Sequence, residues 1–303
     1  APSVTSASIV PSSPKTLDVL TCTPGTASDA DGDTVVFEYS WTLNGSTVAT
    51  TTMTLPASAH KKGDTLSCAI TPTDGTDAGT QRTSGTITVQ NSAPSIAVIT
   101  LTPTSATRSD LLTCATSGIQ DDDGDAVTVT TVWQINGTAI TYSGTTLANT
   151  YFKKADVVVC SGTPNDGTTN GPVISSTSVT ITNAAPVLDS VSLTPTSAAT
   201  DDDLTCVLGS ALDADGDAIT YQYAWLINTV PHSSTGATLS HSAYSRGDSV
   251  QCEVTPTDGT TSGTPVRATA VVIQNTKPTV ASALVGPSTP RTTNTLVCSP
   301  GAT

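Results

Sequence analysis

The stretch DADGDTVVFEYSW at residues 29–41 decides the fold, because it recurs twice with the same spacing. It reads DDDGDAVTVTTVW at residues 121–133 and DADGDAITYQYAW at residues 213–225, so successive copies start 92 residues apart. Each copy joins an acidic turn to a segment in which apolar and polar residues alternate until a tryptophan. A period of this length is too long for a solenoid repeat and fits one small domain per copy.

The period divides the 303 residues into three complete repeats and a remainder. We expect the first repeat at 1–92, the second at 93–183 and the third at 184–276, with 277–303 beginning a fourth repeat that is truncated. Within each repeat, Gly, Pro and Asn turn signals separate about seven short segments that alternate with period two, and none has helical periodicity. The pattern predicts an all-β fold of tandem sandwich domains.

The seven cysteines follow one another at equal intervals of 46 residues. Close pairs of the CxxC type are missing, which argues against zinc, and regular pairs indicate disulfides in an oxidising, extracytoplasmic compartment. Pairing within repeats is expected, because the equally spaced alternative, Cys68 with Cys114, crosses a linker and excludes the tryptophan. The expected bridges are Cys22–Cys68, Cys114–Cys160 and Cys206–Cys252. Cys298 then has no partner within this stretch.

The order cysteine, tryptophan 19 residues later and cysteine 27 residues after that resembles the immunoglobulin fold. That resemblance implies a disulfide of the B–F type joining two sheets, with Trp41, Trp133 and Trp225 packed against it in the core. The DxDGD turn before the tryptophan strand resembles polycystic-kidney-disease-type and cadherin-like repeats of exported microbial surface proteins. That second resemblance implies calcium between successive domains, which stiffens the chain.

The acidic turns are the candidate metal sites, because closely spaced carboxylates repel one another and a hard cation relieves that repulsion. In a sandwich the turn after each first cysteine and the Thr-Pro-x-Asp-Gly turn after each second cysteine lie at the same end. The linker from the preceding repeat, which carries Asn91 or Asn183, arrives there as well. The alternative is a solvated turn whose aspartates only accept backbone amide hydrogens. The candidate ligands for calcium are Asp29, Asp31, Asp33 and Asp74; Asp121, Asp123, Asp125 and Asp166; and Asp213, Asp215, Asp217 and Asp258.

A basic turn follows in each repeat, as HKKGD, FKKAD or SRGD. We expect it at the opposite end from the acidic turn, facing the acidic turn of the next repeat. The cations placed to pair head to tail with the next repeat's carboxylates are Lys61, Lys62, Lys153, Lys154 and Arg246. The alternative is that they are ordinary solubilising surface charges. Exposed pairs of this kind stabilise by only about 0–1 kcal/mol each, so they bias orientation more than they add stability.

Charge and residue types exclude several functions. The net charge of −14 argues against nucleic acid, whose phosphates need a basic surface. No apolar run of 18 residues occurs, so any export signal or membrane anchor is expected outside this stretch. The three histidines, His60, His232 and His241, occupy unrelated positions in the repeats, and there is no Gly-rich phosphate loop. We therefore do not expect an enzyme.

The sequence predicts a structural segment of an extracellular or cell-surface protein, such as a stalk, adhesin or filament of tandem immunoglobulin-like domains. Its expected partners are the neighbouring repeats and other copies of the same protein. The alternative is a spacer or polysaccharide-binding module of a secreted hydrolase. That alternative needs exposed aromatic side chains, for which Tyr142, Tyr151 and Tyr244 are the candidates.

Overall fold

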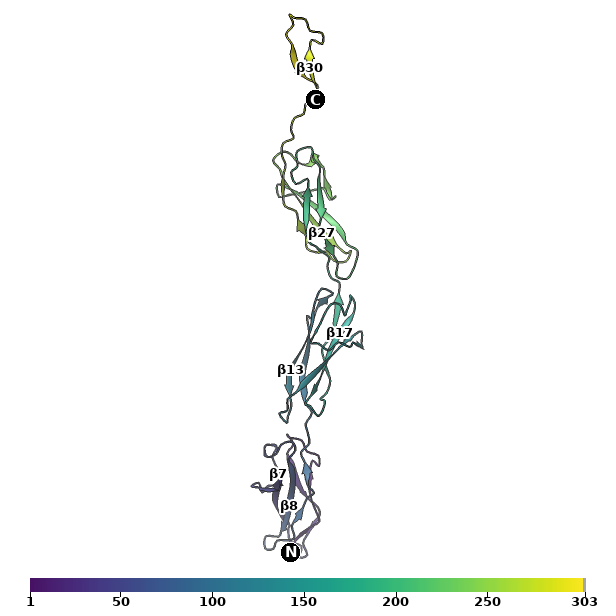
Figure 1. Ribbon diagram of the computed structural model, residues 1–303. Helices are drawn as coiled ribbons and strands as arrows, with labels where there is room; N and C mark the ends of the chain where they lie inside the picture. The colour runs from purple at the N-terminus through teal and green to yellow at the C-terminus, as the bar shows by residue number, and fades with distance from the viewer. Residues whose placement is uncertain (302–303) are drawn as a thin grey trace. The chain divides into compact units, whose positions relative to one another are not determined.

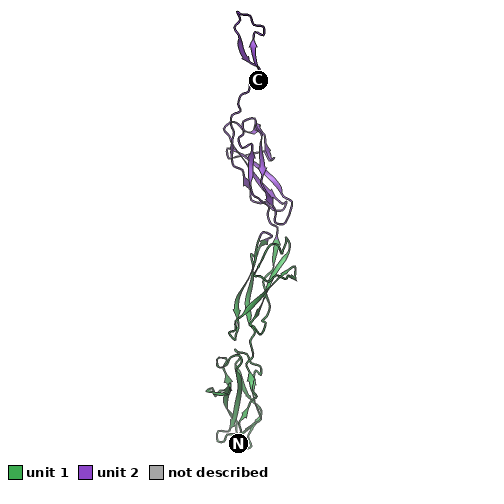
Figure 2. Ribbon diagram, viewed as in Figure 1, with its two compact units in different colours: residues 1–106, 110–181 green, residues 107–109, 182–303 purple. Residues whose placement is uncertain are grey.

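The computed structural model describes residues 1–301 and consists of β-strands and two single-turn 3-10 helices (Figure 1). Its internal contacts divide it into two units, residues 1–106 with 110–181 and residues 107–109 with 182–303 (Figure 2). The first unit holds two separate hydrophobic cores, and the second unit holds one. Each core lies within one of the three predicted repeats, whose boundaries stay a prediction.

The first core lies between two antiparallel sheets. One sheet has the order β2-β3-β7 and the other β10-β8-β5-β6, with β9 also beside β8 and a separate pair formed by β1 and β4. The strands are β1 (Ser3–Val4), β2 (Ala7–Val10), β3 (Leu20–Pro24), β4 (Ala27–Ser28), β5 (Val36–Leu43), β6 (Ser46–Val48), β7 (Thr54–Leu55), β8 (Thr65–Thr73), β9 (Arg82–Thr83) and β10 (Ile87–Thr88). Every second residue of β8 is buried, which is the alternation expected of a strand with one face on the core.

The second core repeats this plan. One sheet has the order β11-β13-β16, and the facing sheet contains the run β19-β17-β14-β15 with β18 beside β17. The strands are β11 (Ser95–Thr102), β12 (Ala106–Thr107), β13 (Leu112–Gln120), β14 (Thr128–Ile135), β15 (Thr138–Ala139), β16 (Thr146–Leu147), β17 (Val157–Asn165), β18 (Ile174–Ser175) and β19 (Val179–Thr182).

The second unit contains the third core, between the sheets β21-β22-β26 and β25-β24-β27-β28, with β29 also beside β27. Two further pairs are β20 with β23 and β30 with β31. The strands are β20 (Val187–Leu188), β21 (Val191–Thr194), β22 (Leu204–Leu208), β23 (Ala211–Leu212), β24 (Thr220–Ile227), β25 (Val230–His232), β26 (Thr238–Leu239), β27 (Ser249–Thr257), β28 (Val266–Arg267), β29 (Val271–Val272), β30 (Ala283–Gly286) and β31 (Val297–Pro300).

Two one-turn 3-10 helices, Ala57–Ala59 and His241–Ala243, depart from the expectation of no helix. Each has only three residues, which is too short for hydrophobic periodicity to reveal. In the third repeat the turn is capped, because the Ser240 hydroxyl accepts a hydrogen bond from the backbone amide of Ser242. Both turns precede the basic turn and leave the sandwich plan unchanged.

The two sheets of each core are joined by one disulfide. Cys22 bonds to Cys68, Cys114 to Cys160 and Cys206 to Cys252, so each bridge lies within a repeat. The free Cys298 is exposed on β31, opposite Val285, in the same register that pairs Ile9 with Cys22.

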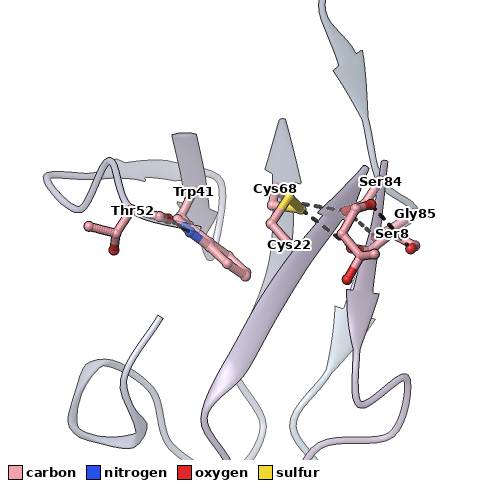
Figure 3. Close-up of a disulfide and its surroundings, with 8 residues drawn as sticks. Ser8, Cys22, Trp41, Thr52, Cys68, Ser84 and Gly85 are labelled. Carbon is pink, nitrogen blue, oxygen red and sulfur yellow. Dashed lines mark hydrogen bonds between the residues drawn. A yellow bond between two sulfur atoms is a disulfide. The ribbon is translucent and has the colours of Figure 1, made fainter. Parts of the chain in front are cut away.

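A tryptophan packs beside each bridge. Trp41, Trp133 and Trp225 stand directly opposite the second cysteine on the neighbouring strand, and all three are fully buried. Figure 3 shows the Trp41 ring facing the Cys22–Cys68 bridge. The indole N–H donates to the carbonyl of Thr52, Gly144 or Gly236 at 2.7–3.0 Å, so burial leaves no unpaired donor. Sheet order, bridge and tryptophan together define tandem immunoglobulin-like β-sandwiches.

Removing one bridge should destabilise its repeat. Each bridge closes a loop of 46 residues, which the chain-entropy model equates with about 4 kcal/mol of unfolding free energy. We expect the double variant Cys114→Ala/Cys160→Ala to lose about that much for the second repeat, measured by denaturant titration of the oxidised protein. Cys298→Ala is the matched control and should leave the unfolding curve unchanged. Equal curves for the double variant and the wild type would contradict the prediction.

Candidate functional site

Each acidic turn is built around its first aspartate. One oxygen of Asp29, Oδ1, accepts the backbone N–H groups of Asp31 at 2.8 Å and Asp33 at 3.4 Å. Asp121 and Asp213 make the same two bonds at 2.8–3.2 Å to the residues two and four positions later. The glycine inside each turn has φ between +78° and +85°, which a residue with a β-carbon rarely adopts. The sequence DxDG therefore folds this bend locally.

The second oxygen of the same aspartate has no hydrogen-bond partner in any repeat. Oδ2 of Asp29, Asp121 and Asp213 is buried and accepts no hydrogen bond. The Asp29 side chain has no exposed area, and its Oδ2 lies 3.8 Å from the amino group of Ala1. Asp213 is 7% exposed. A buried carboxylate oxygen without a hydrogen-bond donor is costly. The turns of the second and third repeats therefore each present a buried oxygen that lacks a donor, whereas Asp29 Oδ2 has the amino group of Ala1 nearby.

The predicted ligands converge in two of the three repeats. In the second repeat, carboxylate oxygens of Asp121, Asp125 and Asp166 all lie within 4.8 Å of one another. In the third repeat, oxygens of Asp213, Asp215 and Asp217 do the same. Within residues 1–301, no comparable group forms from the first-repeat candidates Asp29, Asp31, Asp33 and Asp74. The Thr-Pro-x-Asp-Gly turn thus contributes an oxygen to the group only in the second repeat.

Three of the predicted ligands accept backbone N–H groups of their own turn or of the linker. Asp74 accepts the amides of Thr76 and Asp77 within its own turn. Asp123 Oδ2 accepts the backbone N–H of Ser92 at 2.6 Å, and Asp215 Oδ2 accepts that of Ala184 at 2.7 Å. These two aspartates therefore hold the linker that leads into their repeat.

An asparagine in each linker also binds the Thr-Pro-x-Asp-Gly turn of the repeat that follows. Asn91 Nδ2 donates to Asp166 Oδ2 at 2.7 Å, and Asn183 Nδ2 donates to Asp258 Oδ2 at 2.7 Å. We call this pair of contacts, asparagine to aspartate and linker amide to aspartate, the linker clasp. The sequence placed Asn91 and Asn183 in the linkers beside the acidic turns but did not predict which groups would accept their hydrogen bonds. Their 92-residue spacing from each other and their 75-residue separation from the acceptors were the usable signal.

The asparagine contacts of the clasp lower the pKa of the two carboxyl groups that accept them, Asp166 and Asp258. The pKa of the Asp166 carboxyl is lowered, first because the Asn91 side chain donates to it and next because the Thr169 backbone N–H does. The pKa of the Asp258 carboxyl is lowered in the same way by Asn183 and by the backbone N–H groups of Thr261 and Thr260. Hydrogen bonds to a carboxylate favour its ionised form, so these groups stay anionic well below neutral pH.

The basic turn of the first repeat contacts the second repeat inside the first unit. Lys62 Nζ forms an ion pair with Asp125 Oδ2 and donates to Asn91 Oδ1 at 3.0 Å. The Thr16 hydroxyl donates to Asp123 Oδ1. The bond to Asp125, followed by the attraction of nearby carboxylates, raises the pKa of Lys62. The predicted head-to-tail pairing is therefore observed for Lys62.

The aromatic residues do not form a recurrent binding surface. Tyr244 is 7% exposed, and its hydroxyl donates to the backbone carbonyl of Asp202, so the expectation that it is exposed is wrong. The reason is its position in the repeat, which His60 and Phe152 also occupy as buried residues. Tyr142 and Tyr151 lie against each other with ring centroids 5.1 Å apart.

No protein-family model matches the sequence, and no curated protein matches it. Among solved structures, the FN1–FN3 domains of chicken CNTN1 align over 90% of this chain and 98% of that chain, with 9% identity and a TM-score of 0.31. A Ca2+-stabilized adhesin that helps an Antarctic bacterium reach out and bind ice aligns over 94% and 78%, with 14% identity and a TM-score of 0.30. A segment of titin aligns over 91% and 99%, with 12% identity and a TM-score of 0.35. At such identities and TM-scores, function has to be inferred from the residues themselves.

The clasp predicts a specific change in titration. Replacing Asn183 by alanine removes the main hydrogen bond to Asp258, so the pKa of Asp258 should rise toward its ordinary value. Because a lowered pKa stabilises the folded state above the unfolded pKa, this contribution is lost as pH falls through the folded pKa. Between neutral pH and the folded pKa of Asp258, the variant should therefore have a smaller free energy of unfolding than the wild type. Carbon-detected NMR of the carboxyl groups measures the shift.

Asn275→Ala is the matched control for this titration. Asn275 lies 92 residues after Asn183, and its side chain donates to the Thr276 carbonyl at 2.8 Å. It should leave the Asp258 titration unchanged. An Asp258 pKa that is the same in Asn183→Ala and in the wild type would show that the clasp does not perturb this carboxylate.

Proposed function

We propose that the chain is a structural segment of an extracellular or cell-surface stalk, adhesin or filament built from tandem immunoglobulin-like repeats. The observation that carries the proposal is the linker clasp, which ties each of two linkers to the repeat that follows it with the same pair of bonds. A binding module joined by free linkers has no need of such a contact, whereas a segment that transmits force or sets spacing does.

Three disulfides support a location outside the cytoplasm, because such bonds persist in oxidising compartments. Among residues 1–301, no helix has the length and apolar character needed to span a membrane. The repeats 1–92, 93–183 and 184–276 are proposed as the units of this segment, with relatives among polycystic-kidney-disease-type and cadherin-like domains. The proposed partners are neighbouring repeats and other copies of the same protein.

We further propose that calcium binds the acidic turns. The first aspartate uses Oδ1 to accept the backbone amides of the turn, which is the role expected without a metal. Its Oδ2 is left buried without a hydrogen-bond partner. In the third repeat, Asp215 Oδ1 is also buried without a partner, and oxygens of Asp213, Asp215 and Asp217 lie within 4.8 Å of one another. A flexible loop that offers several carboxylate oxygens is the ligand set that calcium prefers.

The clasp should limit motion between the first two repeats. Genetically encoded spin labels at the exposed positions Thr51 and Ser143 report the distance between them by double electron–electron resonance. We expect a narrow distance distribution in the wild type and a broader one in Asn91→Ala, because the bond to Asp166 is lost. Gln90→Ala, one residue away in the same linker, should keep the narrow distribution. A broad distribution in the wild type would contradict a fixed connection.

Calcium should raise the melting temperature of the third repeat. At about 100 times its Kd, one bound ion stabilises the folded state by about 2.7 kcal/mol. Asp213→Asn keeps the side-chain shape and removes the charge, so the calcium-dependent increase should disappear in scanning calorimetry. Asp189→Asn, an exposed aspartate of the same repeat, should preserve it. If EDTA and calcium give the same melting curve for the wild type, calcium does not bind this turn.

A further inference from the structure

We propose that Lys62 is a built-in cation that holds the first and second repeats together without calcium and competes with calcium for the second-repeat carboxylates. The inference rests on the proposed calcium site and extends it, because it concerns what regulates calcium binding in one repeat. Calcium binding in the second repeat should then be weaker than the carboxylates alone would give.

The lysine binds the same carboxylates that are candidates for the metal. Its Nζ pairs with Asp125 and donates to Asn91 Oδ1 at 3.0 Å, while Asn91 Nδ2 donates to Asp166 Oδ2 at 2.7 Å. Asp125 and Asp166 provide the two oxygens that cluster with an oxygen of Asp121. One ammonium group therefore connects, directly or through Asn91, to two of the three candidate ligands.

The backbone that carries Lys62 is held by hydrogen bonds within the first repeat. Gly63 has φ +86°, and its N–H donates at 2.9 Å to the carbonyl of Val89, the residue that follows β10, which joins the basic turn to the end of its repeat. Asp64 accepts the Lys61 backbone N–H at 2.9 Å and the Asn44 side chain at 2.7 Å. A fixed turn lowers the entropy lost when the side chain binds, so the lysine is positioned for this contact.

Asp123 belongs to the same acidic turn but not to the cluster, and it too binds residues of the first repeat. Both oxygens of Asp123 accept hydrogen bonds, Oδ1 from the Thr16 hydroxyl and Oδ2 from the Ser92 amide. The corresponding Asp215 has one oxygen bound to the Ala184 amide and the other buried and unpaired. Calcium entering the second repeat has to displace contacts made by the first repeat, whereas Asp215 offers calcium an unpaired oxygen.

Competition makes a reciprocal prediction, because two ligands that share one site weaken each other by the same factor. Lysine-to-methionine substitution removes the charge and keeps an unbranched side chain of similar length. In a background with Asp29→Asn and Asp213→Asn, which removes the first- and third-repeat sites, Lys62→Met should tighten calcium binding to the second repeat by about tenfold or more, equivalent to about 1.4 kcal/mol. Isothermal titration calorimetry of the full chain measures the Kd.

Lys61→Met is the matched control, because Lys61 is the adjacent, exposed lysine and the substitution changes the net charge equally. It should leave the Kd within about twofold, since exposed charges at a distance are screened. Adding Asp125→Asn to Lys62→Met should weaken binding again. If Lys62→Met and Lys61→Met bind calcium equally well, Lys62 does not compete for the site and the inference is wrong.

A measurement in EDTA separates this inference from the calcium proposal. Without calcium, Lys62→Met should broaden the distance distribution between labels at Thr51 and Ser143, and Lys61→Met should not; saturating calcium should narrow it again in Lys62→Met. An unchanged distribution in Lys62→Met would overturn the holding role of Lys62. If calcium binds neither wild type nor any variant, the calcium proposal and the competition both fail, and the EDTA comparison still decides whether Lys62 holds the repeats.

Discussion

The packing of one tryptophan against one disulfide is the constraint on which each repeat depends. Trp41 and Cys68 stand directly opposite each other on β5 and β8, while Cys22 reaches across from β3 in the other sheet. A shift of one residue in the register of β5 would turn the indole to solvent and leave the bridge without its neighbour. The same three residues recur at 92-residue intervals, so the same register is imposed three times. With only 4% aromatic residues in the chain, little else is large enough to replace this contact.

Once the sandwich is fixed, its two ends acquire different chemistry. The strands that carry the cysteines lead into acidic turns at one end, and the basic turn lies beside the outgoing linker at the other, where Gly63 bonds to Val89. The linker therefore leaves a basic end and enters an acidic end. This polarity lets Asn91 and Lys62 of one repeat reach Asp166 and Asp125 of the next. The contact follows from the order of strands and does not require a separate recognition surface.

Much of the fold could be predicted from spacing, whereas the contacts of the candidate site could not. Cysteine intervals and strand alternation are properties of one repeat, and they predict the bridges and the buried tryptophans directly. The bond from Asn91 to Asp166 depends on how a linker turns into the following repeat, which no local pattern encodes. The burial of Tyr244 lay within reach of the sequence, because Phe152 occupies the same place one period earlier. The prediction that Tyr244 is exposed was wrong because it considered the residue type and not the position of the residue in the repeat.

The two oxygens of one carboxylate show why an acidic turn can be both structural and functional. In each repeat the first aspartate needs only Oδ1 to shape the turn, so the fold is complete without any ion. Oδ2 of the same aspartate is buried and accepts no hydrogen bond in any of the three repeats, so the repeats differ at the later aspartates of the turn. Asp123 receives Thr16 and Ser92, while the corresponding Asp215 keeps one oxygen unpaired. Repeats with the same turn can therefore differ in how many of their carboxylate oxygens accept hydrogen bonds.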